Sequence, residues 1–163
     1  MVSRKLWLDK MHSLRPTWAE IDLKAIAHNI KEIRSLLKTS TKFMAILKAN
    51  AYGHGMLEVA HTCVKQGVDY LGVALLDEAL YLRENGITTP VLILGYTPPS
   101  ALDEVVEYSF RQTIFDQKTA EALSDAAVKK GRKAFVHIKV DTGMSRTGFF
   151  TDEETVKTVA HIC

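Results

Sequence analysis

The chain has 163 residues, of which 47% are hydrophobic and 25% are charged, as is typical of a single globular domain. Its formal net charge of +2 is too small to indicate a nucleic-acid-binding protein. The two cysteines show neither metal-ligand spacing nor a disulfide framework, which favours a reducing compartment and gives no reason to expect a metal site.

The sequence shows no sign of membrane insertion or secretion. No apolar run is long enough to cross a bilayer, and residues 1–15 lack the apolar core of a signal peptide. We therefore expect a cytoplasmic protein that has no membrane partner, in which residues 1–15 form a flexible lead-in to the folded part of the chain.

The first elements predicted along the chain are a strand and a helix. Residues 17–21 alternate weakly between polar and apolar, which predicts a short strand. Asp22 is placed to cap the helix that follows. The apolar residues of that helix recur at helical spacing, at Leu23, Ile26, Ile30, Ile33 and Leu37.

A second strand is predicted over residues 42–47, and its apolar run from residue 43 indicates burial. The helix that follows is predicted to bury Leu57, Ala60 and Val64 and to end at Gly67. Cys63 lies among these residues and is expected to be a small hydrophobic residue of the core.

Strands continue to alternate with helices to the end of the chain. Further strands are predicted at residues 70–74, 90–95, 112–115 and 134–140. The predicted caps of the intervening helices are Asp77, Ser100, Asp116 and Thr151. This alternation predicts repeated βαβ units and a parallel sheet.

Five βα units, counted from the strand at residues 42–47, fit two architectures. One is an open, five-stranded, flavodoxin-like sheet, which is complete at this length. The other is the first five-eighths of a closed (β/α)₈ barrel, which needs eight units and about 250 residues. Composition and spacing do not separate these two architectures.

Lys48 stands at the carboxyl end of an apolar strand and is followed by Ala-Asn-Ala-Tyr-Gly-His-Gly. Parallel α/β folds carry their chemistry at this end of the strands. Burial of an ammonium is costly, and a desolvated lysine amine is a good nucleophile toward carbonyls. These residues indicate a Schiff-base lysine, and the plainer alternative is a lysine that extends to solvent.

A second polar stretch, residues 139–149, follows the last predicted strand and reads Lys-Val-Asp-Thr-Gly-Met-Ser-Arg-Thr-Gly-Phe. Its glycines allow tight turns close to a ligand, and Arg146 is able to bind a carboxylate or a phenolic oxygen. In the alternative interpretation Arg146 pairs with Asp141 or with solvent, and Lys139 pairs with Asp141 or points to water.

Both stretches resemble signatures of the alanine racemases, which are pyridoxal-phosphate enzymes with a barrel and a mainly β C-terminal domain. The resemblance implies that residues 16–163 are the N-terminal part of a (β/α)₈ TIM-type barrel and that the C-terminal β domain is absent from this chain. It also implies that the strand expected at residues 17–21 packs against that domain.

The resemblance assigns roles to four residues. Lys48 would hold pyridoxal 5′-phosphate as a Schiff base and act as a catalytic base. Arg146 would contact the phenolic oxygen of the cofactor and the substrate carboxylate, and Tyr52 would contact the cofactor phosphate. Lys139 would be carbamylated to N6-carboxylysine, as in many family members, and would steady Arg146. Ser145 departs from the glycine that many members carry at this position.

The implied activity is the interconversion of L-alanine and D-alanine by a homodimer, which supplies D-alanine for peptidoglycan. The second acid/base of that reaction, a tyrosine of the other subunit's C-terminal domain, and most phosphate ligands lie in sequence that this chain lacks. We therefore expect the chain alone to be inactive and unstable. The alternatives are a non-catalytic pyridoxal-phosphate homeostasis barrel, a serine racemase of the same superfamily and a flavodoxin-like binding module.

Overall fold

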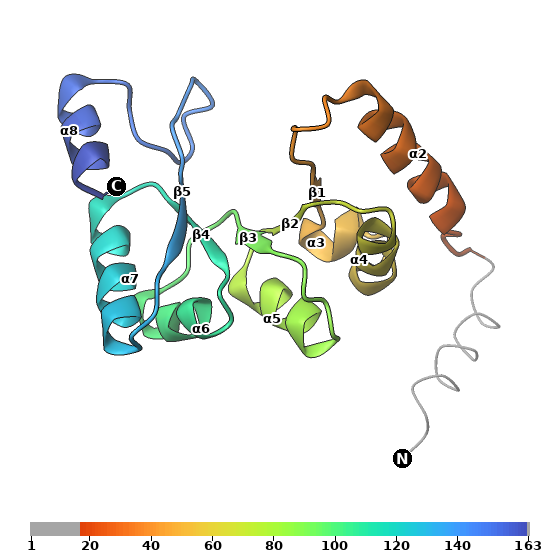
Figure 1. Cartoon of the computed structure of the whole chain (residues 1–163), viewed down its shortest axis with the longest axis horizontal. Helices are drawn as coiled ribbons and strands as arrows, with labels where there is room; N and C mark the ends of the chain where they lie inside the picture. Colours follow the sequence, from red (N-terminus) through yellow and green to blue (C-terminus); the bar gives the residue numbers. More distant parts are fainter. Residues whose placement is uncertain (1–16, 163) are drawn as a thin grey trace, which may run out of the picture.

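The computed structural model describes residues 17–162, which form a five-stranded parallel sheet with helices along it (Figure 1). The strands pair in chain order, each parallel to the next. They are β1 (Met44–Ile46), β2 (Tyr70–Val73), β3 (Val91–Ile93), β4 (Arg111–Ile114) and β5 (Phe135–Ile138).

The strand order decides between the two predicted architectures. A flavodoxin-like sheet reverses its direction of growth, with the order 2-1-3-4-5. Here the order is β1-β2-β3-β4-β5 without a reversal, which is the order of a barrel wall. The predicted fold class, part of a (β/α)₈ barrel with five parallel strands, is confirmed, and β1 and β5 are the two edges of the wall.

The helices from α3 to α7 connect successive strands, α2 precedes β1, and α8 follows β5. The helices α5, α6 and α7 lie along one face of the sheet (Figure 1). A short 3₁₀ turn, η1 (Pro99–Ala101), precedes α6. The helices are α2 (Leu23–Leu36), α3 (Lys48–Tyr52), α4 (Met56–Lys65), α5 (Leu76–Glu84), α6 (Leu102–Glu107), α7 (Gln117–Lys129) and α8 (Glu153–Ile162).

The core lies between the sheet and its helices. Alternate residues of the central strands point toward the helices and are fully buried, and each such aliphatic side chain contributes about 1.5–3 kcal/mol. The strand residues of this kind are Leu71, Val73, Val91, Ile93 and Ile114, and the helix residues that meet them include Ala79, Leu82, Val105 and Leu123.

Two of the predicted helix caps are confirmed. The carboxylate of Asp22 accepts a hydrogen bond from the Lys24 N–H at 2.8 Å, at the start of α2. The carboxylate of Asp116 accepts one from the Thr119 N–H at 2.8 Å, at the start of α7. Both bonds satisfy amides that have no partner within the helix.

Three predicted caps were wrong, because these helices start at residues other than those predicted. Asp77 lies within the first turn of α5, and Ser100 lies within the 3₁₀ turn. At α8 the cap is Asp152 rather than Thr151, since the Asp152 carboxylate accepts a hydrogen bond from the Thr155 N–H at 2.8 Å.

The strand predicted at residues 17–21 was also wrong. These residues have no regular secondary structure, and residues 17–20 are exposed. A strand needs a partner for its backbone hydrogen bonds, and the described part of the chain offers none there. The predicted lead-in, residues 1–15, lies outside the described residues.

The strand before Lys48 is less buried than its sequence predicted. Because β1 is an edge strand, residues 43–45 are half-buried and Ile46 is 37% exposed. The opposite edge is similar, since Phe135 of β5 is 45% exposed. An apolar run indicates a strand, but only its neighbours in the sheet determine how far it is covered.

The helix α4 buries a face different from the predicted one. Leu57 is half-buried and Val64 is 39% exposed, so neither lies at the centre of the interface. The buried residues follow the spacing i, i+3, i+4 and i+7 from the first helical position, at Met56, Val59, Ala60 and Cys63.

Two other expectations for this part of the chain are confirmed. Cys63 is 2% exposed, and burial raises the pKa of its thiol, as suits a small core residue. The chain leaves α4 at Gly67, whose φ of 75° lies in the left-handed region that glycine adopts freely. Within residues 17–162, no helix combines the length and apolarity needed to span a bilayer.

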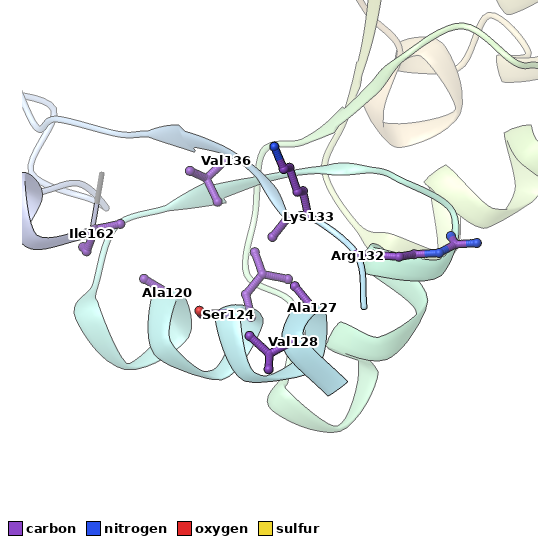
Figure 2. A pocket seen from close by; sticks show the side chains of 10 residues that line it. Ala120, Ser124, Ala127, Val128, Arg132, Lys133, Val136 and Ile162 are labelled. Carbon is purple, nitrogen blue, oxygen red and sulfur yellow. The ribbon is translucent and has the colours of Figure 1, made fainter. Parts of the chain in front are cut away.

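A hollow of about 330 Å³ lies where α7, β5 and the end of α8 meet. Figure 2 shows Ala120, Ser124 and Val128 of α7 on one side, with Val136 of β5 and Ile162 of α8 around them. The hollow lies at the β5 edge of the sheet, whereas Lys48 follows β1 at the opposite edge.

Candidate active site

Lys48 is the first residue of α3 and is separated from the end of β1 by Leu47 alone. The preceding Leu47 is 2% exposed, and its N–H donates to the Gly72 carbonyl at 2.7 Å, which extends the β1–β2 pairing by one bond. Lys48 itself is half-buried rather than buried, because it leaves an edge strand. The backbone of this residue is therefore anchored, while its amine remains accessible.

The residues after Lys48 form a left-handed turn. Ala49, Asn50, Ala51 and Tyr52 have φ values of 54°, 56°, 52° and 54°. This conformation costs roughly 1–2 kcal/mol for each residue other than glycine. Four consecutive residues in this region are strained, and strain of this kind is concentrated at functional sites. The sequence predicted a loop here but not its handedness.

Local hydrogen bonds hold the turn. The Ala51 N–H donates to the Leu47 carbonyl at 2.7 Å, and the Met56 N–H donates to the Asn50 side-chain oxygen at 2.8 Å. The His54 ring nitrogen Nδ1 lies 2.9 Å from the Ala51 carbonyl oxygen. His54 thus closes the loop, a role consistent with its place between two glycines.

Tyr52 and Lys48 lie close together. The Lys48 Nζ atom is 5.9 Å from the centre of the Tyr52 ring, a distance at which an ammonium is attracted to the face of an aromatic ring. Tyr52 is 61% exposed, so its hydroxyl is available to a ligand beside Lys48.

Backbone hydrogen bonds close the second polar stretch, residues 139–149, into a loop after β5. The Phe149 N–H donates to the Lys139 carbonyl at 2.8 Å, and the Asp141 N–H donates to the Phe149 carbonyl at 2.9 Å. A Cβ atom at Gly148 would clash with the backbone of Asp141, so the loop closes this tightly only with glycine at that position.

The Asp141 side chain bonds to the loop backbone. Its carboxylate accepts hydrogen bonds from the Ser145 N–H at 3.0 Å and the Gly143 N–H at 2.9 Å, and these bonds lower the pKa of its carboxyl group. Among residues 17–162, no ion pair within 4 Å joins Asp141 to Arg146 or Lys139. The alternative interpretation paired each cation with Asp141 or with solvent. The pairing with Asp141 is not observed, whereas Arg146 is exposed to solvent, as that interpretation allowed.

Lys139 has a partner that the sequence did not reveal. Its Nζ atom donates to the Thr147 hydroxyl at 2.8 Å, and Arg146, next to Thr147, is exposed. Ser145 has a φ of 55°, which accounts for the glycine that related sequences are expected to carry there. Only the loop geometry brings Lys139 and Thr147 together.

Lys48 and Arg146 follow strands at opposite edges of the sheet (Figure 1). Because all five strands are parallel, both residues lie beyond the carboxyl ends, at the edge where barrel enzymes hold their sites. Four inter-strand steps of about 4.8 Å each separate β1 from β5 along the sheet. The two residues therefore occupy the same end of the wall without direct contact.

A comparison of the whole chain with known protein families identifies the family to which it belongs. Residues 21–163 match the family model described as the alanine racemase N-terminal domain. The chain belongs to the alanine racemase family. Members of this family are isomerases that use pyridoxal phosphate.

Individual alanine racemases cover most of this chain. The alanine racemase of Desulfovibrio desulfuricans is 55% identical over 139 residues, which are 85% of this chain and 38% of that protein. The solved alanine racemase of Clostridium difficile in complex with cycloserine is 42% identical, with a TM-score of 0.86, over 91% of this chain and 41% of that one.

A third relative is the alanine racemase of Bacillus anthracis, whose structure has bound L-Ala-P. It is 36% identical, with a TM-score of 0.78, over 91% of this chain and 38% of that one. The chain therefore matches the N-terminal barrel portion of alanine racemases and spans about two fifths of the length of these relatives.

Proposed function

We propose that this chain carries the cofactor lysine of a pyridoxal-phosphate-dependent racemase that interconverts L-alanine and D-alanine. The observation that carries the proposal is the position of Lys48, which leaves the carboxyl end of β1 and enters a strained left-handed turn with Tyr52 beside its amine. The signature around Lys48 resembles that of the cofactor lysine of the family.

The residues at this position suit pyridoxal phosphate. The amine of Lys48 has no carboxylate within 4 Å among the described residues, so no ion pair must break before it reacts with an aldehyde. The exposed hydroxyl of Tyr52 is free to donate a hydrogen bond to a phosphate oxygen. Arg146, at the same end of the sheet, supplies a cation for a carboxylate or a phenolic oxygen.

When bound, pyridoxal phosphate withdraws electrons from the Cα atom of an amino acid. In the proposed reaction the Nζ atom of Lys48 removes the Cα proton from one face of one enantiomer and, in the reverse direction, delivers a proton to that same face. Arg146 holds the substrate carboxylate and so fixes which face Lys48 meets. Racemisation also needs an acid on the other face, and the resemblance assigns that role to a tyrosine outside this chain.

The remaining parts of the proposal concern the whole protein. Residues 16–163 would be the N-terminal part of the barrel, and a C-terminal β domain would complete each site across a homodimer. Lys139 would carry a carbamate beside Arg146. The protein would act in the cytoplasm and supply D-alanine for peptidoglycan.

Chemical trapping of the cofactor tests the assignment of Lys48. The purified chain is mixed with pyridoxal phosphate, reduced with borohydride and digested, and the modified lysines are mapped by mass spectrometry. We expect the label to concentrate at Lys48, to disappear in Lys48→Ala and to persist in Lys38→Ala, which removes an exposed lysine. Labelling spread evenly over exposed lysines would contradict the proposal.

Exchange of the Cα proton then separates a racemase from a non-catalytic carrier. Because exchange on one face needs only Lys48, it is measurable without the second acid. We expect the chain with pyridoxal phosphate to incorporate deuterium from D₂O into alanine faster than free cofactor does, with loss of this excess in Lys48→Ala. Labelling of Lys48 without exchange would favour the homeostasis protein, and faster exchange into serine would favour a serine racemase.

A further inference from the structure

The carboxylate of Glu78, in the first turn of α5, accepts hydrogen bonds from three backbone amides. Its Oε2 atom accepts from the Ala74 N–H at 2.7 Å and from the Leu75 N–H at 3.3 Å. Its Oε1 atom accepts from the Ala49 N–H at 2.7 Å. The bond to Leu75 is the ordinary one between an acidic residue at the third helical position and the helix cap.

The bond to Ala49 has no such local explanation. Ala49 precedes Glu78 by 29 residues and belongs to the preceding βα unit. It directly follows Lys48 and is the first residue of the left-handed turn. The Glu78 carboxylate therefore joins this turn to the carboxyl end of β2.

This bond fixes the peptide plane on one side of Lys48. The amide of Ala49 shares that plane with the carbonyl of Lys48, so holding the amide limits rotation about the last backbone bond of Lys48. On the other side, the bond from the Leu47 N–H to the Gly72 carbonyl holds the backbone to β2. Lys48 is thus held between a sheet hydrogen bond and a carboxylate.

We propose that Glu78 is a positioning residue, which orients Lys48 for reaction with the cofactor by anchoring the left-handed turn to the second βα unit. This inference rests on the proposed function of Lys48. A hydrogen bond to an ionised carboxylate is stronger than one between neutral groups, and so it is suited to hold a backbone conformation that costs free energy in each of four residues.

The neighbouring Asp77 offers a matched control. Both carboxylates lie in the first turn of α5, but Asp77 is exposed, and among the described residues its side chain accepts no hydrogen bond. Glu78→Gln and Asp77→Asn remove the same charge from the same turn. Both substitutions replace one carboxylate oxygen by an NH₂ group, which cannot accept a hydrogen bond. Because both oxygens of Glu78 accept backbone N–H bonds, only Glu78→Gln removes an acceptor that is in use.

The first readout is the pyridoxyl label at Lys48 after borohydride reduction, measured relative to the label on exposed lysines. We expect Glu78→Gln to lower this ratio about tenfold, the effect of losing about 1.4 kcal/mol, and Asp77→Asn to leave it unchanged. Equal ratios in Glu78→Gln and in the unmodified chain would overturn the inference while the role of Lys48 stood. If the chain without substitutions shows no preferential labelling of Lys48, both this inference and the proposed function of Lys48 are overturned.

The second readout needs neither cofactor nor activity. Hydrogen exchange of the Ala49 amide, followed by NMR, should be about tenfold faster in Glu78→Gln, while amides in β2 and β3 keep their protection. If Glu78→Gln does not fold, Glu78→Asp serves as the second variant, because it keeps the charge but shortens the side chain and so draws the carboxylate away from the Ala49 N–H. Exchange of the Ala49 amide that is equally slow in Glu78→Asp and in the chain without substitutions would overturn the inference.

Discussion

Arg34 and Asp69 connect α2 to the start of β2: the Nη2 atom of Arg34 lies 2.8 Å from the Oδ2 atom of Asp69. The same carboxylate accepts the Phe43 N–H at 2.8 Å and the Lys42 ammonium at 3.1 Å. One acidic side chain therefore joins the helix α2, the segment that leads into β1 and the turn before β2. The strand that carries Lys48 is positioned in part by this contact.

The Asp69 cluster should make the fold sensitive to acid. The Arg34 hydrogen bond, the Phe43 N–H and the Lys42 ammonium hold the pKa of the Asp69 carboxyl well below its usual range. A carboxyl whose pKa is lower in the folded state stabilises the fold above its unfolded pKa of about 4, and this stabilisation is lost as the pH falls toward the folded value.

The measurement is the urea midpoint of unfolding as a function of pH. We expect Asp69→Asn to be less stable than the unmodified chain near neutral pH and the difference to shrink on acidification. Asp125→Asn, which changes an exposed carboxyl, should show neither effect. A gap between Asp69→Asn and the unmodified chain that stays constant with pH would count against this account.

The left-handed turn should be stabilised by glycine. Ala49→Gly removes the Cβ atom that makes a φ of 54° unfavourable, and the expected net gain in the free energy of unfolding is about 0.5–1 kcal/mol after the added chain entropy of glycine is subtracted.

The matched control for the turn is Ala122→Gly in the right-handed helix α7, where the same change should cost roughly 0.5–1 kcal/mol. Chemical denaturation of the two variants checks the opposite signs. Destabilisation by both substitutions would mean that the turn is not left-handed in solution.

Lys139 should carry a carbamate that depends on its neighbours. A carbamate would convert a cation into an anion near Arg146 and so reduce repulsion between like charges, and the Thr147 hydroxyl lies 2.8 Å from Nζ, within reach of the added group. With ¹³C-labelled bicarbonate, we expect one carbamate resonance in the NMR spectrum, absent from Lys139→Arg and weakened in Thr147→Val.

The control for this carbamate is Lys133→Arg, which changes an exposed lysine that precedes β5 and should keep the resonance. A signal that survives in Lys139→Arg, or no signal in the unmodified chain, would show that Lys139 remains an ordinary amine.

The chain expressed alone should self-associate. In the described residues the sheet has unpaired edges at β1 and β5, and Val136 on β5 is 37% exposed. Unpaired, apolar strand edges promote association between chains, and charged residues on the edge oppose it. Val136→Lys should therefore lower the average mass in light scattering after size-exclusion chromatography.

Val128→Lys provides a control for this effect, because Val128 is 76% exposed on the helix α7 rather than on a strand edge. It should leave the mass unchanged. A monomeric unmodified chain with a sharp thermal transition would refute the prediction of association.

Several features of this protein depend only on residues that are close together in the chain, and these features could be predicted from the sequence alone. Asp22 and Asp116 cap helices and Gly67 ends one because those effects involve residues a few positions apart. The alternation of strands and helices follows from periodicity in short windows. The positions of Lys48 and Arg146 after strands follow from the same alternation.

The tertiary structure decided what depends on distant parts of the chain. Composition and spacing left a barrel wall and a flavodoxin-like sheet open, and the pairing of the five strands decided between them. The same pairing showed that β1 is an edge strand, which leaves Lys48 half-buried. The bond from Ala49 to Glu78 spans 29 residues. The left-handed turn that begins at Ala49 could not be predicted, because alanine does not favour that conformation. Hydrogen bonds and burial are set by neighbours in space, and a linear pattern records only neighbours along the chain.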